Sequence, residues 1–229
     1  MFCQLLRMND LTVNLRQEQE ATLARPRLAY GLLTRTLFIG MDLLYGRETT
    51  LPKMRLLEIL ARIPYQSWEV RQYIRLHSEY GQASAVAEAR KVMLWGRAAQ
   101  DNEFWHLRVI DERMKQLGIG EGFFRSAVIR WVAVFKYTIF SRLLARFNIR
   151  QAFRINAEFE DHAEHVYMLF VKEHPELETQ KVEGTAVAEV GEFSCWADVF
   201  RRIGLDERDH RNESLIHCGC ASDKVPYLG

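Results

Sequence analysis

Apolar and polar residues follow a helical period along most of the chain, and the alternating pattern of a half-buried strand is scarce. Five prolines and thirteen glycines leave room for long helices between the breaks that they mark. Pro52 suits the first turn of one such helix, and Pro64 predicts a kink further along it. We therefore expect an all-α fold. The expected helices cover residues 28–45, 52–80, 83–117, 123–150, 151–172 and 193–217.

Two of these segments are the most apolar. Residues 28–45 carry only Arg35 and Asp42 as charges, whereas residues 123–150 carry six basic residues and no acid. We interpret both as amphipathic helices that lie in a membrane interface, where long basic side chains reach the headgroups. A buried core helix is the alternative for the first segment, and a nucleic-acid-binding face for the second. Neither segment is an uncharged span long enough to cross a bilayer, so we predict no transmembrane helix.

Composition favours one globular domain with appendages. The 229 residues are 48% hydrophobic, and we expect a domain over residues 28–217, a loosely ordered arm over 1–27 and a tail over 218–229. A net charge of +1 gives no general case for a nucleic-acid partner. The four cysteines lack Cys-x-x-Cys spacing, and with no secretory signal a reducing compartment is expected. Cys218 and Cys220 are either two ordinary thiols or part of a soft-metal site.

Two Glu-x-x-His sequences lie in helical segments, and two other helical segments each carry a lone acid on an apolar face. Residues three apart share a helix face, so each Glu-x-x-His directs a carboxylate and an imidazole toward one point. A four-helix bundle completes a di-iron site when two further helices each add one Glu. The pattern predicts a ferritin-like four-helix bundle with a di-iron carboxylate site. The expected ligands are Glu58, Glu103, His106, Glu160, Glu207 and His210.

Neighbouring acids leave the ligand in the third of these helices open, because Glu158 or Glu164 could replace Glu160. The alternative for each single pair is an exposed acid–base pair that only adds helix stability. The whole constellation favours a metal, because buried carboxylates need cations or protons to offset their desolvation. Four nearby groups are expected outside the ligand set: Glu112 and Asp209 in solvent, and His162 and His165 beyond the ligands.

Five short stretches of the chain follow the pattern of a known family. They are MDLLY at 41–45, LLEILARIPY at 56–65, NEFWH at 102–106, EDHAEHVY at 160–167 and DERDH at 206–210. In these stretches the chain resembles the alternative oxidase family of membrane-bound di-iron quinol oxidases, and most closely its plastid terminal oxidase branch. The likeness runs from about Met41 to Ser214.

The resemblance implies roles for residues around the metal. It makes Tyr167 the tyrosine beside the iron pair, and it lets Asn102 and Asp206 orient ligands through hydrogen bonds. Lys53 stands where the family has an arginine, and lysine lacks the planar fork that could hold a quinone oxygen by two bonds. The connection at 175–192 also differs from the family's. The implied quinol pocket includes Lys53, Leu57 and Ala163.

The function that the resemblance implies is oxidation of ubiquinol or plastoquinol by O2, with water as product and no proton pumping. It also implies a homodimer bound to one leaflet, at the cytoplasmic face of a bacterial inner membrane or the stromal or matrix face of an organelle membrane. Two other classes fit the same ligands. One is a di-iron hydroxylase or desaturase that acts on a membrane-soluble substrate, and the other is a non-enzymatic iron-storing or membrane-binding helical protein.

Overall fold

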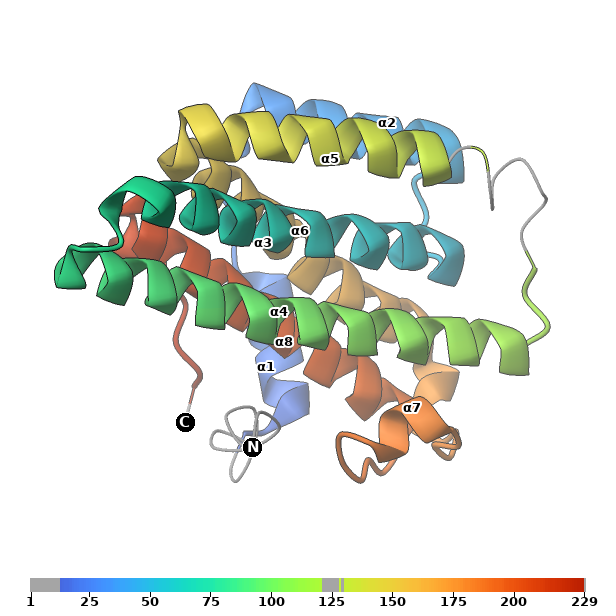
Figure 1. Ribbon diagram of the computed structural model, residues 1–229. Coiled ribbons are helices and arrows are strands. Elements are labelled where there is room, and N and C mark those ends of the chain that lie inside the picture. The colour runs from blue at the N-terminus through green and yellow to red at the C-terminus, as the bar shows by residue number, and fades with distance from the viewer. Residues whose placement is uncertain (1–12, 121–127, 129, 229) are drawn as a thin grey trace.

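The helical periods of the sequence form helices in the computed structural model, which describes residues 13–120, 128 and 130–228 (Figure 1). The described residues form helices and their connections, without a strand. The expected start of the 123–150 helix, with Arg125, lies outside them. The α-helices are α1 Leu15–Ala24, α2 Leu32–Tyr45, α3 Leu51–Glu79, α4 Ala83–Gln116, α5 Arg130–Phe147, α6 Ile149–Glu173, α7 Thr185–Ala188 and α8 Trp196–Cys218, and Pro175–Glu178 and Ala221–Asp223 are 3-10 turns.

Four long helices position the predicted ligands. α3 packs against α4, and α6 packs against α8 over most of its length. Helix α3 has Pro52 in its first turn, as expected, and the helix continues through Pro64. The close fit of α6 and α8 depends on Gly204, because a Cβ there would lie 2.9 Å from Cε of Met168 and 3.2 Å from Cβ of Tyr167. This contact explains a glycine inside a helix, where it otherwise costs stability.

The two apolar helices α2 and α5 lie together on one side of α3 and α6 (Figure 1). Helix α2 buries only one face, through Phe38 and Met41, while Leu32 and Leu43 are 82% and 83% exposed. The core-helix alternative for this segment is therefore wrong. On α5, Trp131 and other large apolar side chains are likewise exposed. Among the described residues, no helix has both the length and the apolar character needed to cross a bilayer.

The expected boundaries shift where side chains bind backbone amides. Helix α2 begins at Leu32 instead of residue 28, because the amides of Leu28 and Gly31 donate to acids on α6. Helix α6 begins at Ile149, where the Asn148 side chain accepts from the Gln151 amide at 3.1 Å and caps the first turn. The same residue separates α5 from α6, so the basic segment ends before residue 150.

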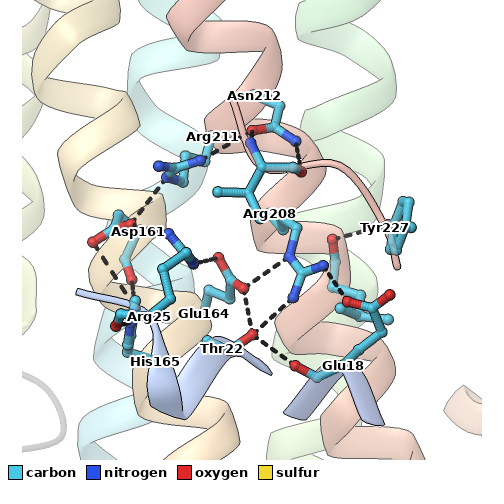
Figure 2. Close-up of polar contacts among 12 residues, drawn as sticks. Glu18, Thr22, Arg25, Asp161, Glu164, His165, Arg208, Arg211, Asn212 and Tyr227 are labelled. Atoms are coloured by element: carbon cyan, nitrogen blue, oxygen red, sulfur yellow. Dashed lines mark hydrogen bonds and ion pairs between the residues drawn. The ribbon is translucent and has the colours of Figure 1, made fainter. Parts of the chain in front are cut away.

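The N-terminal arm is not loose over its described part. Helix α1 packs against α6 and α8, and Glu18, Gln19 and Thr22 on it are buried. Glu18 and Thr22 contact Arg208, and Thr22 also donates to Glu164 at 2.7 Å (Figure 2). These buried partners are polar, so the helix has no apolar stripe that hydrophobic periodicity could detect.

The 175–192 connection and the tail are also held by side chains. Glu112, expected in solvent, is half-buried and accepts from the amides of Thr185 and Ala186 at the start of α7, at 2.9 and 3.0 Å. Glu112 is therefore partly solvated, and its carboxylate also binds the start of α7. In the tail, the Leu228 amide donates to Glu18 at 2.6 Å, which links the C-terminal segment to α1.

Candidate metal centre

The six predicted ligands, from α3, α4, α6 and α8, meet in the protein interior. They form two groups that could each hold a metal ion, with the ligand atoms of each group within 4.8 Å of one another. All six are buried, and five of them are fully inaccessible to solvent. Glu103 and Glu207 belong to both groups. Glu58 and His106 complete one group, and Glu160 and His210 complete the other.

Each histidine directs Nδ1 into this cluster. Nδ1 of His106 lies 3.0 Å from Oε1 of Glu207, 3.2 Å from Oε2 of Glu58 and 3.6 Å from Oε2 of Glu103. Nδ1 of His210 lies 2.8 Å from Oε1 of Glu103 and 3.3 Å from Oε2 of Glu207. The shared glutamates thus stand between the two histidines, as the three-residue spacing on α4 and α8 requires.

The opposite nitrogen of His106 is held from outside the cluster. Nε2 lies 3.2 Å from Oδ2 of Asp206, and Arg202 donates from Nε to Oδ1 of the same carboxylate at 2.9 Å. A histidine ligand whose second nitrogen binds a carboxylate has a fixed tautomer and ring orientation. Asn102 contacts Asp206 at 3.3 Å. Asn102 can therefore orient His106 only through Asp206. The pKa of Asp206 lies below its usual value, because the charges of Arg202 and His106 outweigh the effect of burial, which alone would raise that pKa.

A tyrosine donates to each of the two unshared glutamates. Tyr167 on α6 donates its hydroxyl to Oε1 of Glu58 on α3. Tyr65 on α3 donates to Oε1 of Glu160 on α6 at 2.8 Å, and both tyrosines are fully buried. Sequence reasoning missed Tyr65 as a site residue. The available signal was its spacing from Glu58, which equals the spacing from Glu160 to Tyr167.

The cluster has more carboxylate oxygens than donors. Among the described residues, Oε2 of Glu160 is buried without a hydrogen-bond partner, and Oε1 of Glu207 and both side-chain oxygens of Glu103 have only the ion-pair contacts with histidine Nδ1. Burial and the charges of Glu103 and Glu207 raise the pKa of Glu160 well above its usual value. Burial and Glu207 likewise raise the pKa of Glu58. Such groups are stabilised by a cation, so the donor set fits bound metal ions.

The pKa values of the two histidines are raised as well, but by the neighbouring carboxylates and against the effect of burial. Burial alone would lower the pKa of His106, but the Glu207 charge and hydrogen bonds to carboxylates outweigh it and raise that pKa well above its usual value. The pKa of His210 is also raised, mainly by Glu103 against the effect of burial. For Glu103, burial opposes ionisation, but His210 and His106 lower its pKa to about 2. The surrounding carboxylates thus favour a positive charge at both imidazoles.

The alternative ligands on α6 point elsewhere. Glu158 accepts from the Gly31 amide at 2.9 Å and from Thr34 at 2.6 Å, and Glu164 binds Arg25 and Arg208. Neither belongs to the two ligand groups found among the described residues. The remaining polar neighbours bind other side chains or backbone: His162 stacks on Phe38, and His165 contacts the Asp161 carbonyl. Asp209 keeps 43% of its side chain exposed, as expected, and accepts from Tyr227.

The residues implied for a quinol pocket lie between α2, α3 and α6. Lys53 donates from Nζ to Oδ1 of Asp42 at 2.5 Å and to the Gly46 carbonyl at 2.9 Å. Leu57 and Ala163 belong to an apolar cluster that also contains residues of α2 and α5. A cavity of about 310 Å³ adjoins this cluster, lined by Leu33, Thr34, Leu37, Leu60, Ala133, Lys136, Tyr137, Phe140 and Ile155.

Comparison with known proteins adds no assignment: no family model, no curated protein and no solved structure matches this chain.

Proposed function

We propose that this protein is a quinol oxidase with a non-haem di-iron centre in a ferritin-like bundle of α3, α4, α6 and α8. The observation that carries the proposal is the pair of buried ligand groups that share Glu103 and Glu207. Two bridging carboxylates, one further carboxylate for each ion and two Glu-x-x-His histidines are the donor set of di-iron carboxylate proteins. Oxygen and imidazole donors without a thiolate suit iron.

Each ligand has a role in this scheme. Glu103 and Glu207 would be shared by two irons, Glu58 and His106 would bind one of them, and Glu160 and His210 would bind the other. When bound, the irons supply electrons to O2 and accept electrons from quinol. The protein contributes ligands at fixed positions and excludes bulk water, because all six side chains are buried.

Residues around the ligands fix their orientation and supply protons. Asp206 and Arg202 hold His106 in one tautomer, so Nδ1 stays directed into the cluster. Tyr167 donates a hydrogen bond to Glu58, which places a phenolic proton and an oxidisable ring beside a proposed ligand. In this proposal Tyr167 would provide one electron and one proton to the reduction of O2.

Quinol would reach the centre from the side of α2 and α5. The exposed apolar side chains of these helices and the basic residues of α5 fit an interfacial position in one leaflet. The adjoining cavity is almost entirely apolar and opens between these helices and α3. Lys53, now bound to Asp42 and the Gly46 carbonyl, could donate to a quinone oxygen near Leu57 and Ala163. A homodimer on one membrane face, without proton pumping, completes the proposal.

The rival functions differ in their products. A di-iron hydroxylase or desaturase would give a product that carries a new hydroxyl group or double bond. An iron-storing protein would keep iron without quinol-dependent O2 uptake. The apolar cavity lined by α2, α3, α5 and α6 supports a lipid-soluble substrate, so the hydroxylase or desaturase is the second candidate.

The test is O2 consumption by membranes that contain the protein, with a short-chain quinol as donor and cyanide present to silence haem oxidases. Glu103→Ala removes a bridging ligand, and Glu88→Ala on the exposed face of the same helix is the matched control. We expect cyanide-insensitive uptake in the parent and in Glu88→Ala, with quinone as the only organic product. Uptake that persists in Glu103→Ala, or no uptake by folded, iron-loaded protein, would refute the proposal.

A further inference from the structure

A row of aromatic rings leads away from one side of the candidate metal centre. It begins at Tyr65, whose hydroxyl donates to Oε1 of Glu160 at 2.8 Å. The Tyr65 ring also lies 5.7 Å from the ring of His210, measured between centroids. Tyr65 therefore contacts two proposed ligands of the same iron. No step of the proposed quinol oxidation requires this tyrosine.

The row continues through two tryptophans. The Tyr65 ring centroid lies 4.9 Å from that of Trp68 and 5.6 Å from that of Trp95. The two indoles stack on each other at 5.0 Å, and Trp95 stacks on His217 at 4.6 Å with an angle of 17° between the planes. Tyr65 and Trp68 are fully buried, whereas Trp95 and His217 are partly exposed. The row thus joins the interior to the surface near the end of α8.

A pair of thiols lies at the outer end. Cys218, the last residue of α8, and Trp95 both pack against the apolar cluster that contains Tyr65 and Trp68. Gly219 follows in the left-handed region at φ 84°, and the Cys220 amide turns back to the Leu215 carbonyl at 2.8 Å. Both cysteines are free and partly exposed. Burial and a hydrogen bond to Cys220 raise the pKa of Cys218.

These side chains are the ones that one-electron chemistry uses. Phenol, indole and thiol are the most easily oxidised groups among the common side chains, and rings in van der Waals contact give short tunnelling distances. Two neighbouring thiols can give up two electrons in total by forming a disulfide. A cellular thiol reductant can reduce that disulfide back to two thiols. An oxidase that meets O2 without its organic donor needs such a source, because stray oxidation otherwise damages the protein.

We propose that Tyr65 and Trp95 form an electron path from the Cys218 and Cys220 thiols to the candidate metal centre, used when O2 reacts in the absence of quinol. Tyr65 gives one electron to the centre while its proton stays in the hydrogen bond to Glu160. Trp95 then returns an electron to Tyr65, directly or by way of Trp68, and is itself reduced from the thiols.

The chemistry balances after two such transfers. Cys218 and Cys220 have then lost two electrons to the centre and two protons to solvent, and one S–S bond joins them. O2 is the final oxidant: two electrons come from the dithiol and two from the ferrous centre as it becomes ferric, and with four protons, two of them released by the thiols and two from solvent, one O2 is reduced to two waters. This inference rests on the proposed iron centre and its reaction with O2, but it does not depend on quinol as the substrate.

The test uses the full chain, loaded with iron without air, freed of quinol and then exposed to O2. Mass spectrometry of the C-terminal peptide measures the Cys218–Cys220 disulfide, and rapid freezing with electron paramagnetic resonance looks for tyrosyl or tryptophanyl radicals. Tyr65→Phe removes only the hydroxyl, and Trp95→Phe interrupts the row. Trp131→Phe, on the exposed face of α5, is the matched control, and zinc-loaded protein controls for oxidation by air alone. Iron content is measured in every sample.

We expect disulfide formation that needs both iron and O2, that is lost in Tyr65→Phe and Trp95→Phe, and that persists in Trp131→Phe. Equal disulfide yield in parent, Tyr65→Phe and Trp95→Phe would overturn the path, and so would its absence from iron-loaded parent protein. Trp95→Phe keeps the test valid if Tyr65→Phe loses iron, because Trp95 contacts no ligand in the proposed set.

The same samples separate this inference from the proposed function. Quinol-dependent O2 uptake without the disulfide would leave the quinol oxidase standing and overturn the path. The disulfide without quinol-dependent uptake would support the path and refute the quinol oxidase.

Discussion

Arg208 on α8 offers the sharpest test of how the N-terminal helix is held. Its side chain is 1% exposed and donates to three groups: Oε1 of Glu164 at 2.9 Å, Oε2 of Glu18 at 2.5 Å and Oγ1 of Thr22 at 2.8 Å (Figure 2). The guanidinium also lies 5.4 Å from the ring centre of Tyr227. Arg208→Met keeps much of the volume but leaves two buried carboxylates without this cation.

The expected cost follows from that burial. Removing one partner of a buried ion pair destabilises a protein by about 3–5 kcal/mol, because the remaining charge is buried without compensation. Stabilities of about 5–15 kcal/mol are usual, so the loss is a large fraction of the total. With an m-value of about 2 kcal/mol/M, a loss of about 4 kcal/mol lowers the urea midpoint by about 2 M. The assay is urea unfolding of metal-free protein followed by circular dichroism.

The control is an exposed ion pair. Arg97 binds Glu69 at 2.7 Å with 43% of its side chain exposed, so Arg97→Met should cost only about 0–1 kcal/mol. Equal midpoints for Arg208→Met and Arg97→Met would refute the argument, because they would show that α1 contributes little to the stability of the domain. In that case the sequence-based expectation of a loose arm would describe the protein better than its buried contacts do.

Three further predictions concern residues near the centre. Glu160→Gln should raise the urea midpoint of metal-free protein, because burial disfavours the Glu160 charge, and should weaken metal binding in the group that contains Glu160; a lower midpoint would contradict this. The pKa of Asp161 is lowered, because the Leu28 amide, Arg211 and other cations outweigh the effect of burial. The Asp161 carboxylate therefore contributes to stability above about pH 4, and this contribution is lost as the pH falls through the pKa of the folded protein. Asp161→Asn should therefore flatten the acid limb of a pH–stability curve, and an unchanged limb would contradict it. Gly204→Ala should destabilise by about 1 kcal/mol or more despite better helix propensity, because its Cβ meets α6; thermal unfolding measures this, and a stabilised variant would refute the close contact.

The sequence was most informative where chemistry and helix period coincide. Glu103 and His106 share a face of α4 by spacing alone, and Glu207 and His210 share a face of α8 in the same way. Within each pair, the two side chains point the same way as long as the segment is a helix. Glu160 could not be separated from Glu158 and Glu164 in this way. All three are buried on α6, and the partners that draw Glu158 and Glu164 away come from distant parts of the chain.

What the sequence did not predict depends on long-range polar contacts. Helix α1 has no apolar stripe. The polar side chains on its buried face bind Arg208 and Glu164, which lie far away in the sequence. The role of Tyr65 depends on α3 and α6 approaching closely enough for its hydroxyl to reach Glu160. Such contacts between distant segments leave no periodic signal in either segment.

Metal stoichiometry tests the central claim most directly. Protein reconstituted with ferrous iron without air and freed of excess metal should hold two irons per chain, and after oxidation Mössbauer spectra should show two coupled ferric ions. Glu207→Ala, which removes a ligand common to both groups, should hold fewer than two, and Glu88→Ala should keep both. One iron or none in the folded parent protein, or two uncoupled ions, would contradict a shared-carboxylate centre.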